Sequence, residues 1–177
     1  MRRIVITGGP GAGKTTLLAA LSKRGFTTVA ESARQVIAER LARGETPRPS
    51  PEAFAREILR RDVEKYFAQP ANSELVFYDR SVIEAIAMLH EATPLPESEL
   101  QGHLATYPFF KTVFALPPWE AIYRTDTERD HSFAHSERVY HELVRWYRSC
   151  GYAIHHVPCA PVEQRANHVL HVLAGAA

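Results

Sequence analysis

Cysteine, long apolar runs and net charge are all scarce in this chain. Two cysteines among 177 residues cannot build a disulfide framework, and they do not form a Cys-x-x-Cys pair. No apolar stretch is long enough to cross a bilayer, and the N-terminus enters an apolar segment too soon for a signal peptide. A formal net charge of +1 gives no bulk field that would attract nucleic acid or a membrane surface. We therefore expect a cytoplasmic protein that neither spans a membrane nor binds nucleic acid.

Apolar residues, in contrast, are plentiful enough for a substantial core. They make up 45% of the chain, which suits one globular domain. No internal repeat or low-complexity linker interrupts the sequence, and its proline-rich breaks are short. We predict a single domain over residues 1–177.

Runs that predict strands alternate with stretches that predict helices. Strands are expected at 3–7, 26–30, 75–78, 112–116 and 153–157. Between and after them, helices are expected at 14–24, 32–43, 52–68, 81–91 and 97–106, and again before Gly151 and after Pro161. This alternation predicts an α/β fold, a three-layer sandwich with a five-stranded parallel sheet covered by helices on both faces. In such sheets ligands bind beyond the carboxyl ends of the strands.

Two of the expected helices show apolar stripes at helical spacing. The helix before Gly151 has a stripe of Val139, Leu143, Trp146 or Tyr147, and Cys150. The last helix is expected to bury Val162, Ala166, Val169 and Leu173.

The most specific motif lies between the first strand and the first helix. It fits G-x-x-x-x-G-K-[ST], the phosphate-binding loop or Walker A motif. Glycines let the backbone N–H groups turn toward a polyphosphate, at which the positive end of the next helix dipole also points. Lys14 can reach the β- and γ-phosphates, and the Thr15 hydroxyl can ligate Mg²⁺. The predicted nucleotide-binding residues are Gly8, Gly9, Pro10, Gly11, Ala12, Gly13, Lys14, Thr15 and Thr16.

Asp79 follows a buried strand and is a candidate metal ligand. A carboxylate at that place can bind Mg²⁺ directly or through water, although Asp79 can instead cap the next helix. We favour the metal role because the phosphate-binding loop already predicts a metal nearby. Arg80 comes next, where many ATP hydrolases place a carboxylate, and its guanidinium is better suited to hold phosphate.

Glu31 ends the second expected strand, on the side of the transferred phosphoryl group where an acceptor binds. Its carboxylate can take the proton from an attacking hydroxyl, and Arg34 one turn later can hold the acceptor or pair with Glu31. A solvated glutamate in the first turn of a helix fits the residues equally well.

The segment 119–136 is dense in charge and is predicted to form a mobile lid. Arg124 and Arg129 lie within it, separated by acidic residues that keep the segment near neutral. Two such arginines can close over a triphosphate, exclude water and offset charge in the transition state. The alternative is a solvated helix face laced with ion pairs. We favour the lid because a phosphoryl-transfer site needs cationic closure.

Nine histidines raise the question of a further metal site. His131 and His135 are four residues apart and can share a helix face. No third or fourth ligand accompanies them, so zinc is not predicted.

The motifs together resemble the AAA-type ATPase/kinase family that includes the ribosylnicotinamide kinase domain of the bacterial NAD-biosynthesis regulator. More distantly, the chain is similar to deoxynucleoside kinases and other small P-loop kinases. The matching stretches are Ile4–Thr15, Glu31–Arg34, Tyr78–Ser81, Tyr123–Asp130 and Gly151–Pro158.

The resemblance implies a P-loop NTPase fold with an Arg-bearing lid. In the similar kinases, a glutamate after the second strand is the proposed base, which Glu31 matches. Their acidic-Arg-Ser motif serves metal and phosphate, which Asp79 and Arg80 match, and their lid arginines match Arg124 and Arg129.

The leading hypothesis is a kinase that transfers phosphate from Mg-ATP to a hydroxyl of a small, nucleoside-like molecule. The acceptor pocket is expected between residues 34 and 70. The alternative is a nucleotide-binding switch that hydrolyses slowly and acts through a protein partner. GTP is less favoured as the nucleotide because no Asn/Thr-Lys-x-Asp motif occurs. A nucleic-acid-dependent ATPase is weakly supported because no basic stripe is evident.

Overall fold

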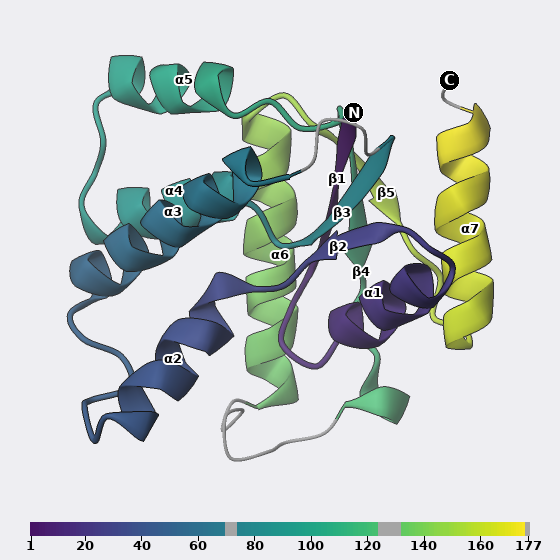
Figure 1. The fold of residues 1–177 in the computed structure, drawn as a ribbon, viewed down its shortest axis with the longest axis horizontal. Coiled ribbons are helices and arrows are strands. Elements are labelled where there is room, and N and C mark those ends of the chain that lie inside the picture. Colours follow the sequence, from purple (N-terminus) through teal and green to yellow (C-terminus); the bar gives the residue numbers. More distant parts are fainter. Residues whose placement is uncertain (70–73, 124–131, 176–177) are drawn as a thin grey trace.

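The strands of the computed structural model form one parallel sheet, with the chain described over residues 1–69, 74–123 and 132–175. Figure 1 shows this sheet at the centre of the molecule, with helices on both sides. Its strand order is β2-β3-β1-β4-β5, and every neighbouring pair is parallel. The strands are β1 (Arg2–Gly8), β2 (Thr27–Val29), β3 (Leu75–Asp79), β4 (Thr112–Leu116) and β5 (Ala153–His156). The expected α/β fold with a five-stranded parallel sheet is confirmed.

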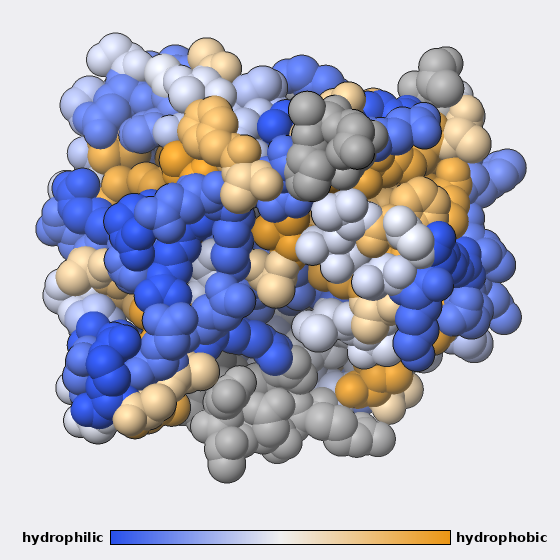
Figure 2. All heavy atoms as spheres, viewed as in Figure 1, coloured by the Kyte–Doolittle hydropathy of each residue, from blue (hydrophilic) through white to orange (hydrophobic). Residues whose placement is uncertain are grey.

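Seven α-helices and one 3₁₀ helix accompany the strands in the described part of the chain. They are α1 (Lys14–Lys23), α2 (Ser32–Ala42), α3 (Pro51–Phe67), α4 (Val82–Ala92), α5 (Glu97–Thr106), η1 (Glu120–Ile122), α6 (Phe133–Ser149) and α7 (Val162–Gly175). Hydrophilic side chains gather over α2 and α3 on the face shown in Figure 2. No helix in these described ranges combines the length and apolar character that crossing a bilayer requires.

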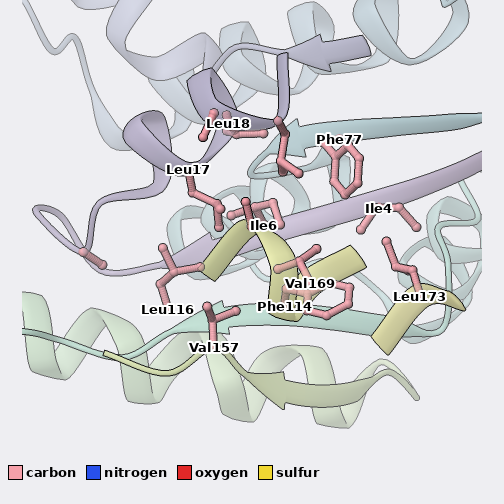
Figure 3. Close-up of a cluster of buried hydrophobic side chains, with 14 residues drawn as sticks. Ile4, Ile6, Leu17, Leu18, Phe77, Phe114, Leu116, Val157, Val169 and Leu173 are labelled. Atoms are coloured by element: carbon pink, nitrogen blue, oxygen red, sulfur yellow. The ribbon is translucent and has the colours of Figure 1, made fainter. Parts of the chain in front are cut away.

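The sheet separates two hydrophobic cores because successive side chains of a strand point to opposite faces. Ile4 and Ile6 of β1 are fully buried and pack with α1 and α7, as Figure 3 shows. Val5 lies between them in sequence and packs in the second core, with α3, α4 and α6. Burial on both faces explains why β1 is a continuous apolar run rather than an alternating one.

Parallel pairing brings the carboxyl ends of the strands to one edge of the sheet. Ile6 of β1 pairs with Asp79, the last residue of β3, and Gly8 pairs with Leu116 of β4. The predicted phosphate-binding loop, or glycine loop (residues 8–15), continues from β1 into α1 and therefore begins beside the end of β3.

Helix α6 begins inside the segment that the sequence assigns to the lid. Ser132 caps it by accepting a hydrogen bond from the backbone N–H of His135 at 3.2 Å. Residues 133–136 therefore belong to α6, and the lid predicted over 119–136 was too long at this end.

The deeply buried face of α6 is also different from the apolar stripe found in the sequence. Its buried residues are Ser136, Tyr140, Val144 and Tyr147. Val139 and Leu143 are only half buried and line a cavity instead. Of the two aromatic residues left open by the sequence, Tyr147 is fully buried.

A pair of histidines joins the last helix to the sheet. Nε2 of His155 in β5 and Nε2 of His168 in α7 are 2.8 Å apart, so one ring donates a hydrogen bond and the other accepts it. Burial, with the nearby His155 and His171, lowers the pKa of His168 below its ordinary value of 6.5. The folded protein therefore favours a neutral His168.

We expect acidification to weaken the folded state through this pair. A histidine with a lowered pKa in the folded state contributes stability above pH 6.5, the ordinary value, and loses it as the pH falls below. The melting temperature of His168→Gln should therefore fall less than that of the wild type between neutral pH and pH 5.5. Replacement of the exposed His141 by Gln is the control. Parallel curves for wild type and His168→Gln would contradict the expectation.

Candidate active site

Lys14 lies at the start of α1 and reaches back into the glycine loop. Its Nζ donates hydrogen bonds to the carbonyl oxygens of Gly8 and Gly9, at 3.0 and 3.1 Å. Burial, followed by the nearby Arg80 charge, lowers the pKa of Lys14 to about 8. An ammonium has three N–H donors, so one remains for the oxygen of a ligand.

The loop is so closely packed that it needs its glycines. A side chain at Gly9 would collide with the backbone and hydroxyl oxygens of Ser136 in α6. The same hydroxyl donates a 2.6 Å hydrogen bond to the carbonyl oxygen of Pro10. Gly13 has a φ of +83°, a conformation that other residues seldom adopt. Helix α6 thus supports the outside of the predicted phosphate-binding loop.

Thr15 and Asp79 come together as the sequence predicted. The Thr15 hydroxyl donates to Oδ2 of Asp79 at 3.4 Å. Asp79 is 7% exposed, and its Oδ1 is buried with no hydrogen-bond partner among the described residues. Burial raises the pKa of Asp79, while Lys14 opposes the shift.

A hydroxyl and a carboxylate are the hard oxygen ligands that Mg²⁺ prefers. The orphaned oxygen of Asp79 also has the desolvation cost that a bound cation would offset. The residues therefore fit a magnesium ion, for which Thr15 and Asp79 would be the protein ligands.

Arg80 has an unusual backbone and two carboxylate partners. Its φ of +68° is the one positive value among the non-glycine residues described. Nε donates to Glu31 at 2.9 Å, and Nη1 donates to Glu84 at 2.6 Å. Burial disfavours the charge on Arg80, but Glu31 and Glu84 outweigh it and raise the pKa. These contacts stabilise a conformation that would otherwise be strained.

Glu31 lies between two arginines at the end of β2. Oε1 accepts from Arg80, and Oε2 lies 3.3 Å from Nε of Arg34. Burial alone would raise the pKa of Glu31, but Arg80, Lys14 and Arg34 outweigh it and hold the pKa below its usual value. Glu31 is therefore ionised at neutral pH, and it is partly buried in the site rather than a solvated surface residue.

Glu84 joins this site to α6 through a buried hydrogen-bonded chain. The hydroxyl of Tyr147 donates to Oε1 of Glu84 at 3.0 Å and lies 2.7 Å from Oγ of Ser81. Ser81 in turn accepts from the backbone N–H of Ile83, which caps α4. Every member of the chain has a partner, so the Glu84 that holds Arg80 is itself fixed in position.

A cavity of about 670 Å³ opens beside Lys14 and Glu31. Its apolar wall includes Ile37, Phe54, Ile58, Met88, Leu143 and Trp146. Arg34 and Asp62 add polar groups on the α2 and α3 side. The sequence placed an acceptor pocket between residues 34 and 70, which supplies one side, whereas α4 and α6 supply the other.

Asp62 is the most unusual titratable group on the α3 side of the cavity. Its Oδ1 accepts a hydrogen bond from the Ser32 hydroxyl. Burial raises the pKa of Asp62 to about 6, with the Ser32 bond opposing the shift. A carboxylate held in this way can accept hydrogen bonds from a ligand in the cavity.

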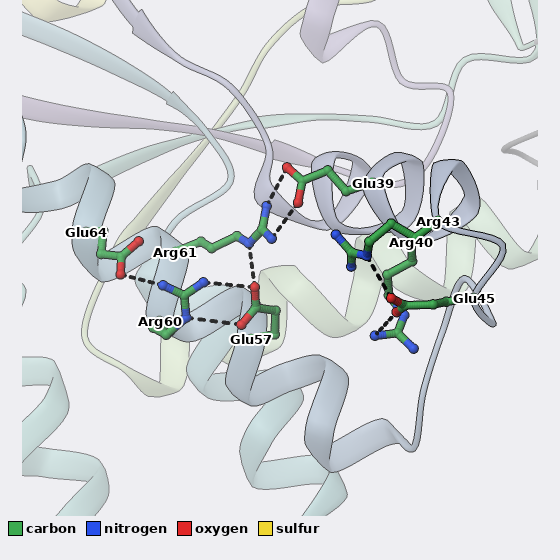
Figure 4. A network of polar contacts seen from close by, with 8 residues as sticks. All are labelled: Glu39, Arg40, Arg43, Glu45, Glu57, Arg60, Arg61 and Glu64. Atoms are coloured by element: carbon green, nitrogen blue, oxygen red, sulfur yellow. Dashed lines mark hydrogen bonds and ion pairs between the residues drawn. The ribbon is translucent and has the colours of Figure 1, made fainter.

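Ion pairs on the protein surface join α2 and α3, the two helices that form this side of the cavity. Figure 4 shows Arg61 of α3 contacting both Glu39 of α2 and Glu57 of its own helix. The Arg61 nitrogens lie 2.9 and 2.7 Å from the Glu39 oxygens. Exposed pairs of this kind contribute little energy singly, but the bidentate geometry fixes how α2 lies against α3.

Arg124 and Arg129, the lid arginines, lie outside the residues that the structure describes, as does His131. Within the described ranges, no cluster of three histidine, cysteine, aspartate or glutamate residues could hold a metal ion.

The sequence analysis assigned no role in the site to Glu84, Asp62 or the buried Arg165 of α7, and it named Tyr147 only as a candidate for an apolar stripe. Glu84 lies four residues after Arg80, the helical spacing of an ion pair, which was an available signal. The others depend on packing between distant elements and have no local signal.

Loss of the Tyr147 hydroxyl should destabilise the protein measurably. Tyr147→Phe keeps the ring but removes a donor to Glu84 and a partner of Ser81, at an expected cost of about 1–2 kcal/mol in the free energy of unfolding. Urea denaturation measures this cost. Tyr152→Phe is the matched control, because in the described part of the chain that hydroxyl, in the same core, makes a single hydrogen bond, accepted from Phe109 at 3.5 Å. Equal stabilities of the two variants would refute the role of the Tyr147 hydroxyl.

Solved structures with the same fold include a deoxyadenosine kinase and a thymidylate kinase. Deoxyadenosine kinase from M. mycoides with bound dATP has a TM-score of 0.62 and 15% identity, over 97% of this chain and 99% of that one. Thymidylate kinase from Ehrlichia chaffeensis has a TM-score of 0.60 and 12% identity, over 98% of each chain. NadR protein in complex with NR has a TM-score of 0.66 and 19% identity, over 98% of this chain and 51% of that one.

At such low identity these likenesses establish the fold alone. No curated protein sequence matches the chain. A family model described as an AAA domain, however, matches residues 3–165, nearly the whole length. The match agrees with the resemblance that the phosphate-binding loop and the strand-end residues indicated, and the chain belongs to the AAA domain family.

Proposed function

We propose that the protein is a kinase that transfers the γ-phosphoryl group of Mg-ATP to a hydroxyl of a small, nucleoside-like molecule. The observation that carries the proposal is that Lys14 of the phosphate-binding loop and Glu31 line the same cavity. A donor phosphate and an acceptor hydroxyl can therefore meet there. The fold is shared with a deoxyadenosine kinase and a thymidylate kinase, which supports a nucleoside-like acceptor.

The chain's own residues would bind and orient the reactants. Loop amides and Lys14 would hold the β- and γ-phosphates, while Glu31 would orient the acceptor hydroxyl and receive its proton. The new bond joins that oxygen to the γ-phosphorus, and the bond from the γ-phosphorus to the bridging oxygen breaks, so ADP leaves. Mg²⁺ held by Thr15 and Asp79 would supply charge neutralisation at the phosphates.

Glu31 is a weak base, and the reaction tolerates one. Its pKa lies below the usual value because Arg80, Lys14 and Arg34 outweigh the effect of burial. Phosphoryl transfer through a loose transition state needs little help from a base early in the reaction. An ionised carboxylate that points at the acceptor is therefore more useful here than a strongly basic one.

The predicted clamp on the phosphates remains part of the proposal. The Arg80 guanidinium already pairs with Glu31 and Glu84, so it would have to bind a phosphate in addition to these two carboxylates. Arg124 and Arg129 of the lid would then supply the closing charge.

The proposal also includes a single catalytic domain and a location in the cytoplasm. Cys150 and Cys159 are both free thiols, which suits a reducing compartment.

Incubation with labelled ATP, Mg²⁺ and a panel of nucleosides that includes ribosylnicotinamide tests the proposal. Label that appears on a nucleoside supports the kinase. Label released only to water, at a rate that a protein partner changes, would instead support a slowly hydrolysing switch.

Substitution of Glu31 should separate binding from transfer. We expect Glu31→Gln to bind Mg-ATP as the wild type does but to lower kcat by about 100-fold, because Gln cannot accept the proton. Lys14→Ala should abolish turnover. Steady-state kinetics and calorimetry measure the two effects, and Glu64→Gln on the exposed surface of α3 is the control. Full activity of Glu31→Gln would eliminate Glu31 as the base.

A further inference from the structure

Arg165 is a buried arginine that lies against the phosphate-binding loop. It is in the first turns of α7 and is only 5% exposed. Nη1 and Nη2 lie 2.8 and 3.3 Å from the point where a Cβ of residue 13 would be. The guanidinium can approach so closely because Gly13 has no side chain. That position is one residue before Lys14, at the anion-binding end of α1.

The charge of Arg165 has no carboxylate partner in the described part of the chain. No ion pair includes it there, and its Nε is buried without a hydrogen-bond partner. Among the described residues its side chain makes one hydrogen bond, from Nη1 to the carbonyl oxygen of Ala12, and that bond is 3.5 Å long. Burial accordingly lowers the pKa of Arg165.

Another arginine, in the interface between α1 and α7, has the polar partners that an arginine usually has. Arg24 at the end of α1 contacts the carboxylate of Glu163 and donates to Oδ1 of Asn167 at 2.8 Å. Glu163 lies two residues before Arg165 on α7, so the nearest carboxylate of that helix is used elsewhere. Arg165 is therefore buried where it gains little from the protein itself, a costly arrangement unless an anion binds beside it.

We propose that Arg165 binds the polyphosphate of the donor nucleotide and is the second cation, beside Lys14, of the phosphate site. The inference rests on the proposed function, because it needs a nucleotide in the loop. The planar guanidinium matches the geometry of phosphate oxygens and can bind two of them at once. The ring of Trp119 lies 5.9 Å from Cζ of Arg165, within the range of a cation–π contact.

Two other roles for Arg165 make different predictions. As a structural brace for the loop, it would stabilise the protein without any ligand. As a platform for the base, together with Trp119, it would contact the nucleoside part of ATP and leave a bare polyphosphate unaffected.

The experiment measures the binding of Mg-ATP and of Mg-tripolyphosphate, which has no base, by calorimetry on the full chain. Arg165→Met keeps an unbranched apolar side chain and removes the charge. We expect it to weaken both ligands by about tenfold or more, as loss of a charge-assisted hydrogen bond does. Arg165→Lys should lose less. Arg24→Gln, the matched control in the same interface, should bind both ligands as the wild type does.

Thermal unfolding without ligand tests the structural brace, because loss of a brace would lower the melting temperature of the ligand-free protein. Because an unpaired buried charge is costly, Arg165→Met should melt no lower than the wild type, while the stabilisation by Mg-tripolyphosphate should shrink. A lower melting temperature with unchanged binding would show a brace and overturn the inference. Weakened binding of Mg-ATP alone would also overturn it, in favour of a base contact.

The wild-type titrations separate this inference from the proposed function. If the wild type binds Mg-ATP and Arg165→Met binds it equally well, only the role of Arg165 fails. If the wild type binds neither ligand, the proposed function fails and the role of Arg165 fails with it.

Discussion

The buried contacts of Arg80 connect the parts of this site. Its guanidinium joins Glu31, after β2, to Glu84 of α4, and Glu84 is held in turn by Tyr147 of α6. A buried arginine without these carboxylates would be costly, and each carboxylate without the arginine equally so. The same contacts hold a backbone φ of +68°, which sets the direction in which the chain leaves Asp79 and enters α4. The positions of Asp79, the proposed metal ligand, Glu31, the proposed base, and one wall of the cavity therefore depend on one another.

Local signals in the sequence predicted the sheet, the loop and the residues at the strand ends. β1 and β3 are short continuous apolar runs, which buried parallel strands must be. The glycine loop is recognisable because the backbone conformation it needs restricts the residue types. Asp79 and Glu31 are far apart in the chain, but Asp79 is the last residue of β3 and Glu31 lies two residues after the end of β2. Because parallel strands end at one edge, the sequence was sufficient to bring these two carboxylates together.

Contacts between distant elements could not be predicted in the same way. The apolar residues of α6 suggested a stripe through Val139 and Leu143, but these line the cavity, while Tyr140 and Val144 pack on the sheet. Helical spacing tells which residues share a face and not what that face contacts, and a cavity wall is as apolar as a core. Arg165 was missed for a similar reason. It lies within an otherwise apolar stripe of α7, and nothing in the sequence relates that stripe to the glycine loop.

The two cores on opposite faces of the sheet determine which helices approach the site from each side. α1 and α7 pack on one face, and α3, α4 and α6 pack on the other. The glycine loop lies at the carboxyl edge, so Arg165 reaches it from α7 while Lys14 lines the cavity on the α3 and α4 side. In-line transfer requires the acceptor and the leaving group to lie on opposite sides of the transferred phosphorus. Helix α7 lies beyond one face of β1, and the cavity lies beyond the other. Under the proposed function, a nucleotide in the glycine loop and an acceptor in the cavity would therefore approach the transferred phosphorus from different sides, as in-line transfer requires.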